Sequence, residues 1–273
     1  METFQLSEEL LKKIADLILA KKNTPLKKIV KDVHFADMAE IINELNEDQG
    51  IYLIKLFDSE KTSEILTELN EDVREKILKA LSVKEIADAF EELDSDDAAD
   101  ILGELSEKRK EEVISEISDN NLADDLKELL SYKEDSAGGL MAKELVLANE
   151  NWSITKCLKE IKKQGENVTR VHSIYVVDDK QKLIGRLSLK DLIISPAKKL
   201  IKDIYIPKVD SVNVYEDGEE VAKIMSKYDL EAIPVVDNNK KLVGRITIDD
   251  IVDFIKEEAE EDYLLAAGVQ GDV

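Results

Sequence analysis

Residues 182–191 read KLIGRLSLKD, and 59 positions later residues 241–250 read KLVGRITIDD. The two segments align without gaps and share a lysine, a leucine, a glycine, an arginine and the final aspartate. Each follows a short polar turn after an apolar run, SIYVVD at 173–178 and AIPVVD at 232–237. Runs rich in β-branched residues and bounded by polar turns are typical of strands. The sequence therefore predicts two related strand pairs.

Helical patterns surround both strand pairs. TKCLKEIKK at 155–163 and EEVAKIMSKY at 219–228 precede them, with apolar residues at helical spacing. The order helix, strand, strand and helix thus occurs twice, which predicts an α/β tandem. We expect Trp152 and Cys157 in the core of the first unit.

The first half of the chain contains a different repeat, which returns at every twenty-fourth position. ELNED at 44–48 recurs at 68–72, as ELDSD at 92–96 and more loosely as EISDN at 116–120. At each half-step of twelve positions an apolar residue precedes Asn, Asp or Ser, the residues preferred at helix N-caps. One short helix per half-step cannot bury its apolar face alone, so we expect the helices to stack into a superhelical solenoid over about 35–131.

The composition is strongly acidic. Sixty-one acidic residues against 38 basic ones give a net charge of -23. Nucleic acids and anionic membranes call for basic surfaces, so cations are the natural ligands. The hydrophobic share of 43%, with four prolines and ten glycines, favours a globular protein over a disordered one. The single cysteine fits a reducing compartment, and the absence of an apolar run near ~20 residues predicts a soluble, cytoplasmic chain.

The two α/β units resemble CBS domains. The resemblance rests on the I/P-V-V-D strand followed by G-x-[LI]-[ST]-[LI]-x-D. An acidic solenoid, DSAGGLM at 135–141, a CBS pair and an acidic helix, in that order, are similar to the cytosolic region of MgtE-type magnesium channels. The resemblance implies a fold of α plus α/β class. It also implies that the protein acts at the cytoplasmic face of the cell membrane. It implies a helical N domain at 1–133, CBS domains at 134–200 and 201–262, and at 263–273 the start of a connector to a membrane domain absent here. The chain is then either part of a longer protein or a stand-alone relative.

Magnesium is a hard, octahedral cation that takes one or two carboxylates and keeps several waters. EELDSDDAAD at 91–100 holds six acids and no base. Asp96 and Asp97 can serve the first turn of a helix, where the macrodipole favours them. Asp100 lies one turn after Asp96 on the same face, so the two repel unless a cation lies near them. The pair is a candidate metal site.

The family resemblance implies a wider set of metal-site residues. Acids of the solenoid would face the second CBS domain across a metal-filled gap, with Glu64, Asp96, Asp100, Gly139 and Asp250 at this gap. Further sites would face the partner subunit or the connector, and their implied residues are Asp217, Glu219, Asp229, Asp253, Glu258, Glu261 and Asp262. An ordinary solvated acidic surface remains the alternative for each acid. Repulsion would open the metal-free state, and Mg²⁺ would draw the acids together and close a pore.

The resemblance also implies adenine-nucleotide binding between the CBS units. The [ST]-x-x-D elements Ser188/Asp191 and Thr247/Asp250 would hold the ribose of ATP or a similar nucleotide. The same pattern is close to a helix capping box, and both interpretations can hold together.

Three functions therefore stay open: a Mg²⁺ sensor, an adenine-nucleotide-responsive module, and a scaffold whose solenoid binds a basic protein. No nucleophile is paired with a base, so we do not expect an enzyme. We expect a homodimer through the CBS pair, because the helices after the strand pairs carry apolar residues that a lone pair would expose. These residues are Leu192, Ile193 and Ile194 in the first unit and Ile251, Val252 and Ile255 in the second.

Overall fold

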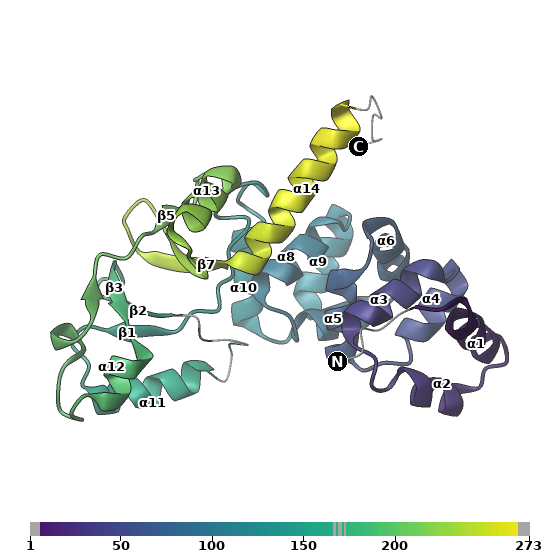
Figure 1. Cartoon of the computed structure of the whole chain (residues 1–273), viewed down its shortest axis with the longest axis horizontal. Coiled ribbons are helices and arrows are strands. Elements are labelled where there is room, and N and C mark those ends of the chain that lie inside the picture. The colour runs from purple at the N-terminus through teal and green to yellow at the C-terminus, as the bar shows by residue number, and fades with distance from the viewer. Residues whose placement is uncertain (1–5, 166–167, 169–170, 172, 267–273) are drawn as a thin grey trace. The chain divides into compact units, whose positions relative to one another are not determined.

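The computed structural model describes residues 6–165, 168, 171 and 173–266, without the side chains of 260–262 and 264–266 (Figure 1). Contacts divide the chain into two compact units. The helical unit comprises Met1–Leu93 and Asp97–Leu126. The second unit, called the α/β unit from here on, comprises Asp94–Asp96 and Lys127–Val273 and contains both strand pairs. A short piece of the helical repeat therefore belongs to the α/β unit.

The repeat forms one helix per half-step, as predicted. Two helices precede it, α1 (Glu8–Leu19) and α2 (Asn23–Val30). The repeat itself consists of α3 (Phe35–Glu44), α4 (Glu47–Ile54), α5 (Ser59–Glu68), α6 (Glu71–Ala80), α7 (Val83–Phe90), α8 (Ser95–Gly103), α9 (Glu107–Glu116) and α10 (Asn120–Leu129). From α3 to α9 each helix begins twelve positions after the start of the one before it.

The N-cap residues explain where these helices begin. Asn46 and Ser82 form capping boxes with the third residues of α4 and α7, and Asp58 accepts the N–H of Lys61. Such caps satisfy backbone N–H groups that have no partner inside the helix. The period slips at the end, because α10 begins one residue late, after Asp119. The half-step expected at Ser131 begins no helix, and α2 was not predicted.

Alternate helices of the repeat pack on one another. Helix α3 packs on α5, α5 on α7 and α7 on α9, while α4 packs on α6. Their buried faces carry the apolar residues of each segment, among them Ile41, Ile65, Ile86 and Val113. Helices α3, α4, α5, α6, α7 and α9 thus pack against helices two half-steps away, which is the solenoid packing expected from the period.

The α/β unit contains two sheets of related build. The first has strand order β1-β2-β3-β4, with β1 (Leu147–Asn149), β2 (Ile174–Val177), β3 (Leu183–Leu187) and β4 (Ile206–Pro207). The second has order β5-β6-β7, with β5 (Val212–Asn213), β6 (Ala232–Val236) and β7 (Leu242–Thr247). In both, the predicted pair is antiparallel and the first strand runs parallel to its neighbour. The strands β1, β4 and β5 were not predicted.

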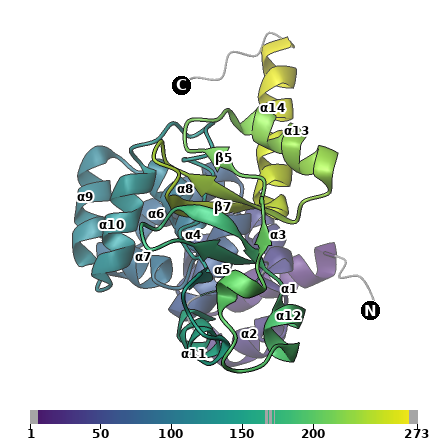
Figure 2. The same ribbon diagram turned by 90° about the vertical axis from the view of Figure 1, so that its left-hand side faces the viewer.

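Helices flank each strand pair in the predicted order. They are α11 (Ile154–Gln164) and α12 (Leu189–Ile194) beside the first strand pair, with a 3₁₀ turn at Ile201–Asp203, and α13 (Gly218–Tyr228) and α14 (Ile248–Ala266) beside the second. Helices α13 and α14 lie side by side (Figure 2). Within the described part of the chain, no helix is both long enough and apolar enough to cross a membrane.

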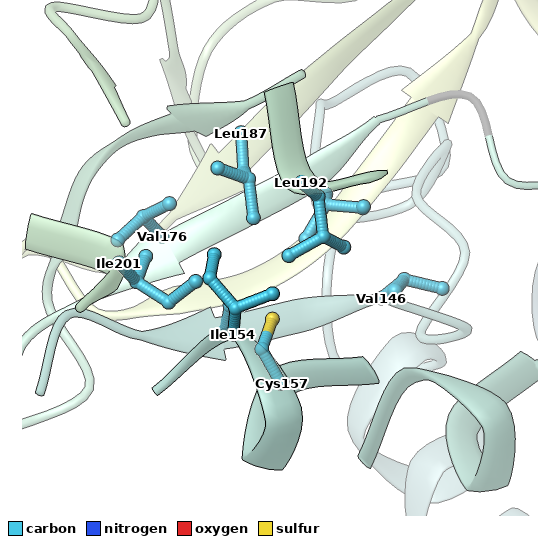
Figure 3. Close-up of a cluster of buried hydrophobic side chains, with 9 residues drawn as sticks. Val146, Ile154, Cys157, Val176, Leu187, Leu192 and Ile201 are labelled. Carbon is cyan, nitrogen blue, oxygen red and sulfur yellow. The ribbon is translucent and has the colours of Figure 1, made fainter. Parts of the chain in front are cut away.

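A hydrophobic core lies between the first sheet and its helices α11 and α12 (Figure 3). Ile154 and Cys157 of α11 and Leu192 of α12 pack against the inner face of the sheet, and Trp152 packs against this cluster, as expected. The expectation that Leu192 and Ile251 lie on exposed faces is wrong, because both are buried. Their neighbours Ile193, Ile194, Val252 and Ile255 are exposed, since successive helix positions turn by about 100°.

The segment before β1 pairs with the second CBS domain rather than the first. Ser136 bridges to Asp217, and Ala142 bridges to Arg245 of β7. Gly138 lies so close to the Tyr132 ring that a Cβ there would meet it at 2.5 Å, so this position needs glycine. The pairing carries residues 142–144 along strand β7.

Candidate functional site: a carboxylate cluster beside Arg245

The pairing of Ala142 with β7 places Glu144 beside Arg245. The Ala142 N–H donates to the Arg245 carbonyl at 2.8 Å, and the Arg245 N–H donates back to Ala142 at 2.9 Å. Two residues further on, the Glu144 carbonyl accepts a hydrogen bond from Arg245 Nε at 2.8 Å. The guanidinium is therefore held against the backbone of the segment that carries Glu144.

Ser95 binds the other side of Glu144. Its backbone N–H lies 3.2 Å from both carboxylate oxygens, and its hydroxyl donates to Oε2 at 2.9 Å. The same hydroxyl accepts the N–H of Lys143 at 2.8 Å. Because Ser95 is the first residue of α8, Glu144 acts as a cap from a distant part of the sequence. These bonds hold residues 94–96 within the α/β unit.

Three carboxylates meet at this point. One oxygen each from Asp94, Asp96 and Glu144 lies within 4.8 Å of the others. Asp96 is 7% exposed, and the other two are half-buried. Arg245 Nη2 makes an ion pair with Asp94 Oδ2 at 3.2 Å. Carboxylates at this separation are the ligands that a hard divalent cation uses, so the cluster can hold Mg²⁺ or a similar ion.

The electrostatics of the cluster follow from its burial. Burial, and then the charge of Asp94, raise the pKa of Glu144, while the bonds from Ser95 oppose this rise. Burial also raises the pKa of Asp250, against hydrogen bonds from Thr247 and the positive charge of Arg245. In both groups burial is the largest cause, and it disfavours the ionised carboxyl. Arg245 influences both Asp94 and Asp250.

The cluster contains one predicted metal residue and two that sequence reasoning missed. Asp96 was predicted, whereas Asp94 and Glu144 were not. A signal for Asp94 existed, because it occupies the N-cap position of the repeat and lies in the acid-rich 91–100 stretch. Glu144 belongs to no motif, and only the pairing of Ala142 with Arg245 brings it to Asp94.

The two [ST]-x-x-D elements have local roles at helix starts. The Asp250 carboxylate accepts the Thr247 N–H at 3.0 Å and the Thr247 hydroxyl at 2.5 Å. The Ser188 hydroxyl accepts the Asp191 N–H at 3.4 Å, at the start of α12. This is the capping interpretation of the pattern, and a ribose contact stays a prediction.

The remaining predicted acids of the second CBS domain lie on α13 and α14. Asp217 caps α13, and Asp229 ends that helix with a left-handed φ of 50°. Glu219 pairs with Lys223, and Asp253 pairs with Lys256. Glu258 is half-buried in α14, and the side chains of Glu261 and Asp262 lie outside the described residues. Their metal roles stay predictions.

The other implied gap residues lie outside this cluster. Glu64 of α5 is exposed and lines a surface hollow with His34 and Asp58, and Asp100 lies in α8; both belong to the helical unit. The N–H of Gly139 donates to the Ser136 carbonyl at 2.9 Å, so any contribution to a metal would come from its carbonyl. That Glu64, Asp100 and Gly139 share a metal with Asp250 stays a prediction.

Two family models match the chain. The MgtE intracellular N domain matches residues 33–135, and the CBS domain matches 137–197 and 201–257. Two solved structures are similar along nearly all of it. The cytosolic domain of the Mg²⁺ channel MgtE in complex with ATP has a TM-score of 0.82 at 30% identity, covering 89% of this chain and 99% of that chain. The soluble part of a magnesium transporter has a TM-score of 0.77 at 28% identity, covering 92% and 99%.

Curated relatives match about half of this chain. The magnesium transporter MgtE of Thermus thermophilus is 41% identical over 131 residues, which are 48% of this chain and 29% of that protein. The magnesium transporter MgtE of Enterococcus faecalis is 39% identical over 140 residues, 51% of this chain and 31% of that protein. These matches span less than a third of either relative. This chain also matches an enzyme, the inosine-5'-monophosphate dehydrogenase of Aquifex aeolicus, at 33% identity over 87 residues, which are 30% of this chain and 18% of that protein, so a match of this extent does not define a function.

The fold and the cluster together define a tandem CBS protein with an N-terminal helical solenoid. The family models that match the helical half and the α/β half of the chain narrow this class of protein further. The chain belongs to the family of MgtE cytosolic regions, formed by the intracellular N domain and the CBS pair. The named relatives in this family are magnesium transporters and a Mg²⁺ channel.

Proposed function

We propose that this chain is the Mg²⁺-sensing regulatory region of a magnesium transporter at the cytoplasmic face of the membrane. The observation that carries the proposal is the meeting of Asp94, Asp96 and Glu144 within 4.8 Å, in a chain of the MgtE family. Three carboxylates so close repel one another, and a divalent cation removes that repulsion. Two unit charges 4 Å apart at an effective dielectric constant of about 20 interact by about 4 kcal/mol.

In this proposal Mg²⁺ favours a compact state, and the compact state favours a closed pore. The predicted residues Glu64, Asp100, Asp250 and Gly139 would add ligands between the helical and CBS domains. The acids of α13 and α14 would add sites against a partner subunit. Moving a two-state equilibrium from 1:99 to 99:1 takes about 5.5 kcal/mol, so a few weak sites suffice.

A magnesium series of thermal unfolding tests the proposal. We expect wild type to gain about 2.7 kcal/mol at a hundredfold excess over the Kd of one site. Asp96→Asn and Glu144→Gln should each gain clearly less. Glu40→Gln, a change at an exposed acid of α3, is the matched control and should behave as wild type. Equal gains in all four proteins would exclude the cluster as a Mg²⁺ site.

The same region would act as a homodimer through its CBS pair. Ile193 and Ile194 of α12 are 66% and 68% exposed, and Ile248, Val252 and Ile255 form a partly exposed apolar stripe on α14. Apolar faces of this kind call for a partner surface. Light scattering should give twice the chain mass for wild type. Ile193→Glu should give a monomer, and Leu19→Glu, at an exposed leucine of α1, should remain dimeric.

Adenine-nucleotide binding is the second candidate. It is favoured by the similar structure at 30% identity, in which the cytosolic domain of the Mg²⁺ channel MgtE is in complex with ATP. Titration of ATP with and without Mg²⁺, followed by calorimetry, separates the two functions. A nucleotide-responsive module would bind ATP and lose binding in Asp191→Ala, whereas a pure Mg²⁺ sensor would respond to Mg²⁺ alone.

A further inference from the structure

Arg245 is an unusual residue for the position it occupies. It lies on β7 and is 7% exposed, although its guanidinium is always charged. Buried charges persist in proteins when opposite charges and hydrogen bonds compensate them. Here Nε donates to the Glu144 carbonyl and Nη2 pairs with Asp94. The carboxylate cluster therefore already contains one fixed cation.

The other CBS domain provides an internal comparison. Arg186 occupies the equivalent place on β3, opposite Tyr175, as Arg245 lies opposite Pro234 on β6. Both arginines follow a glycine in the same strand pattern, yet Arg186 is exposed. The strand pair itself does not require a buried arginine. What differs at Arg245 is the presence of Asp94 and Glu144.

A fixed cation beside three carboxylates has two opposite effects. It offsets their mutual repulsion, so the cluster can persist without metal. It also repels a second cation and occupies an oxygen of Asp94, which a divalent ion would otherwise use.

We infer that Arg245 is a resident counter-ion of the Asp94–Asp96–Glu144 cluster and weakens its affinity for divalent cations. The inference rests on the proposed Mg²⁺ site and concerns its regulation. Mg²⁺ that enters the cluster must draw Asp94 away from the guanidinium or share it. The arginine thereby raises the Mg²⁺ concentration at which the cluster fills, and the metal-free cluster is held together by a built-in positive charge.

Calorimetric Mg²⁺ titration of the whole chain tests the inference. Each titration is repeated with Glu144→Gln added, both to wild type and to Arg245→Gln. The binding that disappears when Glu144→Gln is added is assigned to the cluster and gives its affinity. Arg245→Gln keeps an amide donor for the Glu144 carbonyl but removes the charge. We expect binding about tenfold tighter, because one nearby positive charge is lost. Arg245→Lys keeps the charge and should stay within about threefold of wild type.

The outcomes separate the inference from the proposed function. If Glu144→Gln leaves the wild-type titration unchanged, the cluster is not a Mg²⁺ site and both fail. If Glu144→Gln matters but Arg245→Gln binds no tighter than wild type, the site stands and the counter-ion role is wrong. Should Arg245→Gln fail to fold, the Nε–Hε NMR signal of Arg245 in wild type decides. As Mg²⁺ is added, we expect this signal to shift, with the same midpoint concentration as the Glu144-dependent binding. An unchanged signal would overturn the inference.

Discussion

Ser95 donates two hydrogen bonds to the carboxylate of Glu144, from its N–H at 3.2 Å and from its hydroxyl at 2.9 Å, although 49 residues separate the two. These bonds favour the ionised carboxyl, yet burial and Asp94 outweigh them and raise the pKa of Glu144. The carboxylate that accepts the N–H of Ser95 thus has a pKa above its ordinary value.

The raised pKa of Glu144 predicts a specific pH dependence. Between the ordinary value, 4.5, and the raised value, the unfolded chain has released a proton that the folded chain keeps. The free energy of unfolding should therefore fall as pH rises through this window. In Glu144→Gln this contribution is absent, so its pH dependence should be flatter. Urea denaturation from pH 4 to 7 checks this, with Glu40→Gln as control, and parallel curves for Glu144→Gln and wild type would contradict it.

Tyr175→Phe should stabilise the protein. The Tyr175 side chain is 1% exposed, its hydroxyl has no hydrogen-bond partner among the described residues, and burial raises its pKa to about 12. An unsatisfied buried hydroxyl costs about 1–3 kcal/mol, so its removal should raise the free energy of unfolding by about 1 kcal/mol. Tyr52→Phe is the matched change, because the Tyr52 hydroxyl bonds Asn23 at 2.5 Å, and it should destabilise. Denaturant midpoints that move the same way for both variants would refute the prediction.

Cys157 should be chemically inert in the native protein. The thiol is fully buried in the first CBS core, and burial raises its pKa to about 11. At pH 8 only about one thiol in a thousand would be ionised even with free access. A thiol reagent such as dithionitrobenzoate should give no signal with folded protein and one thiol per chain in urea. A rapid native reaction would show that the packing in Figure 3 opens readily.

Lys61→Met should destabilise the helical unit. The Lys61 ammonium donates to the carbonyls of Val30 and Val33 at 2.9 and 3.1 Å, where α2 ends, and lies 5.1 Å from the centre of the Phe57 ring. Loss of charged hydrogen bonds to these carbonyls should cost about 1.5–3 kcal/mol. Lys27→Met, at an exposed lysine of α2, serves as control and should cost little. Equal unfolding midpoints for the two variants would argue against this capping role.

Local signals in the sequence predicted most of the fold. The caps at Asn46, Asp58 and Ser82 and the apolar spacing between them act over one half-step of the chain, so the helical period could be predicted. The short strands β1 and β5 could not, since they are strands only because β2 and β6 pair with them. The prediction of exposed side chains was also wrong at single positions. Leu192 and Ile251 are buried, although each lies only one helical step from an exposed neighbour.

The candidate site likewise contains residues that could be predicted from the sequence and residues that could not. Asp96 belongs to the recognisable acid-rich stretch at 91–100, and it is the member of the cluster that was predicted. Glu144 reaches the cluster through Arg245, which lies 101 residues away in the chain, and such a contact depends on the assembled sheet. The role of Arg245 was likewise invisible, because Arg186 has the same sequence context and a different environment.

The packing of α3 on α5 and of α5 on α7 limits how the solenoid can change in length. Helices of one row are two half-steps apart, and α3, α5, α7 and α9 pack in sequence within one row, as α4 and α6 do in the other. Deleting a single helix with its turn would exchange the two rows for every helix that follows, whereas deleting two consecutive helices would leave each remaining helix in its own row. Insertions and deletions in this half of the chain should therefore be tolerated in steps of two helices.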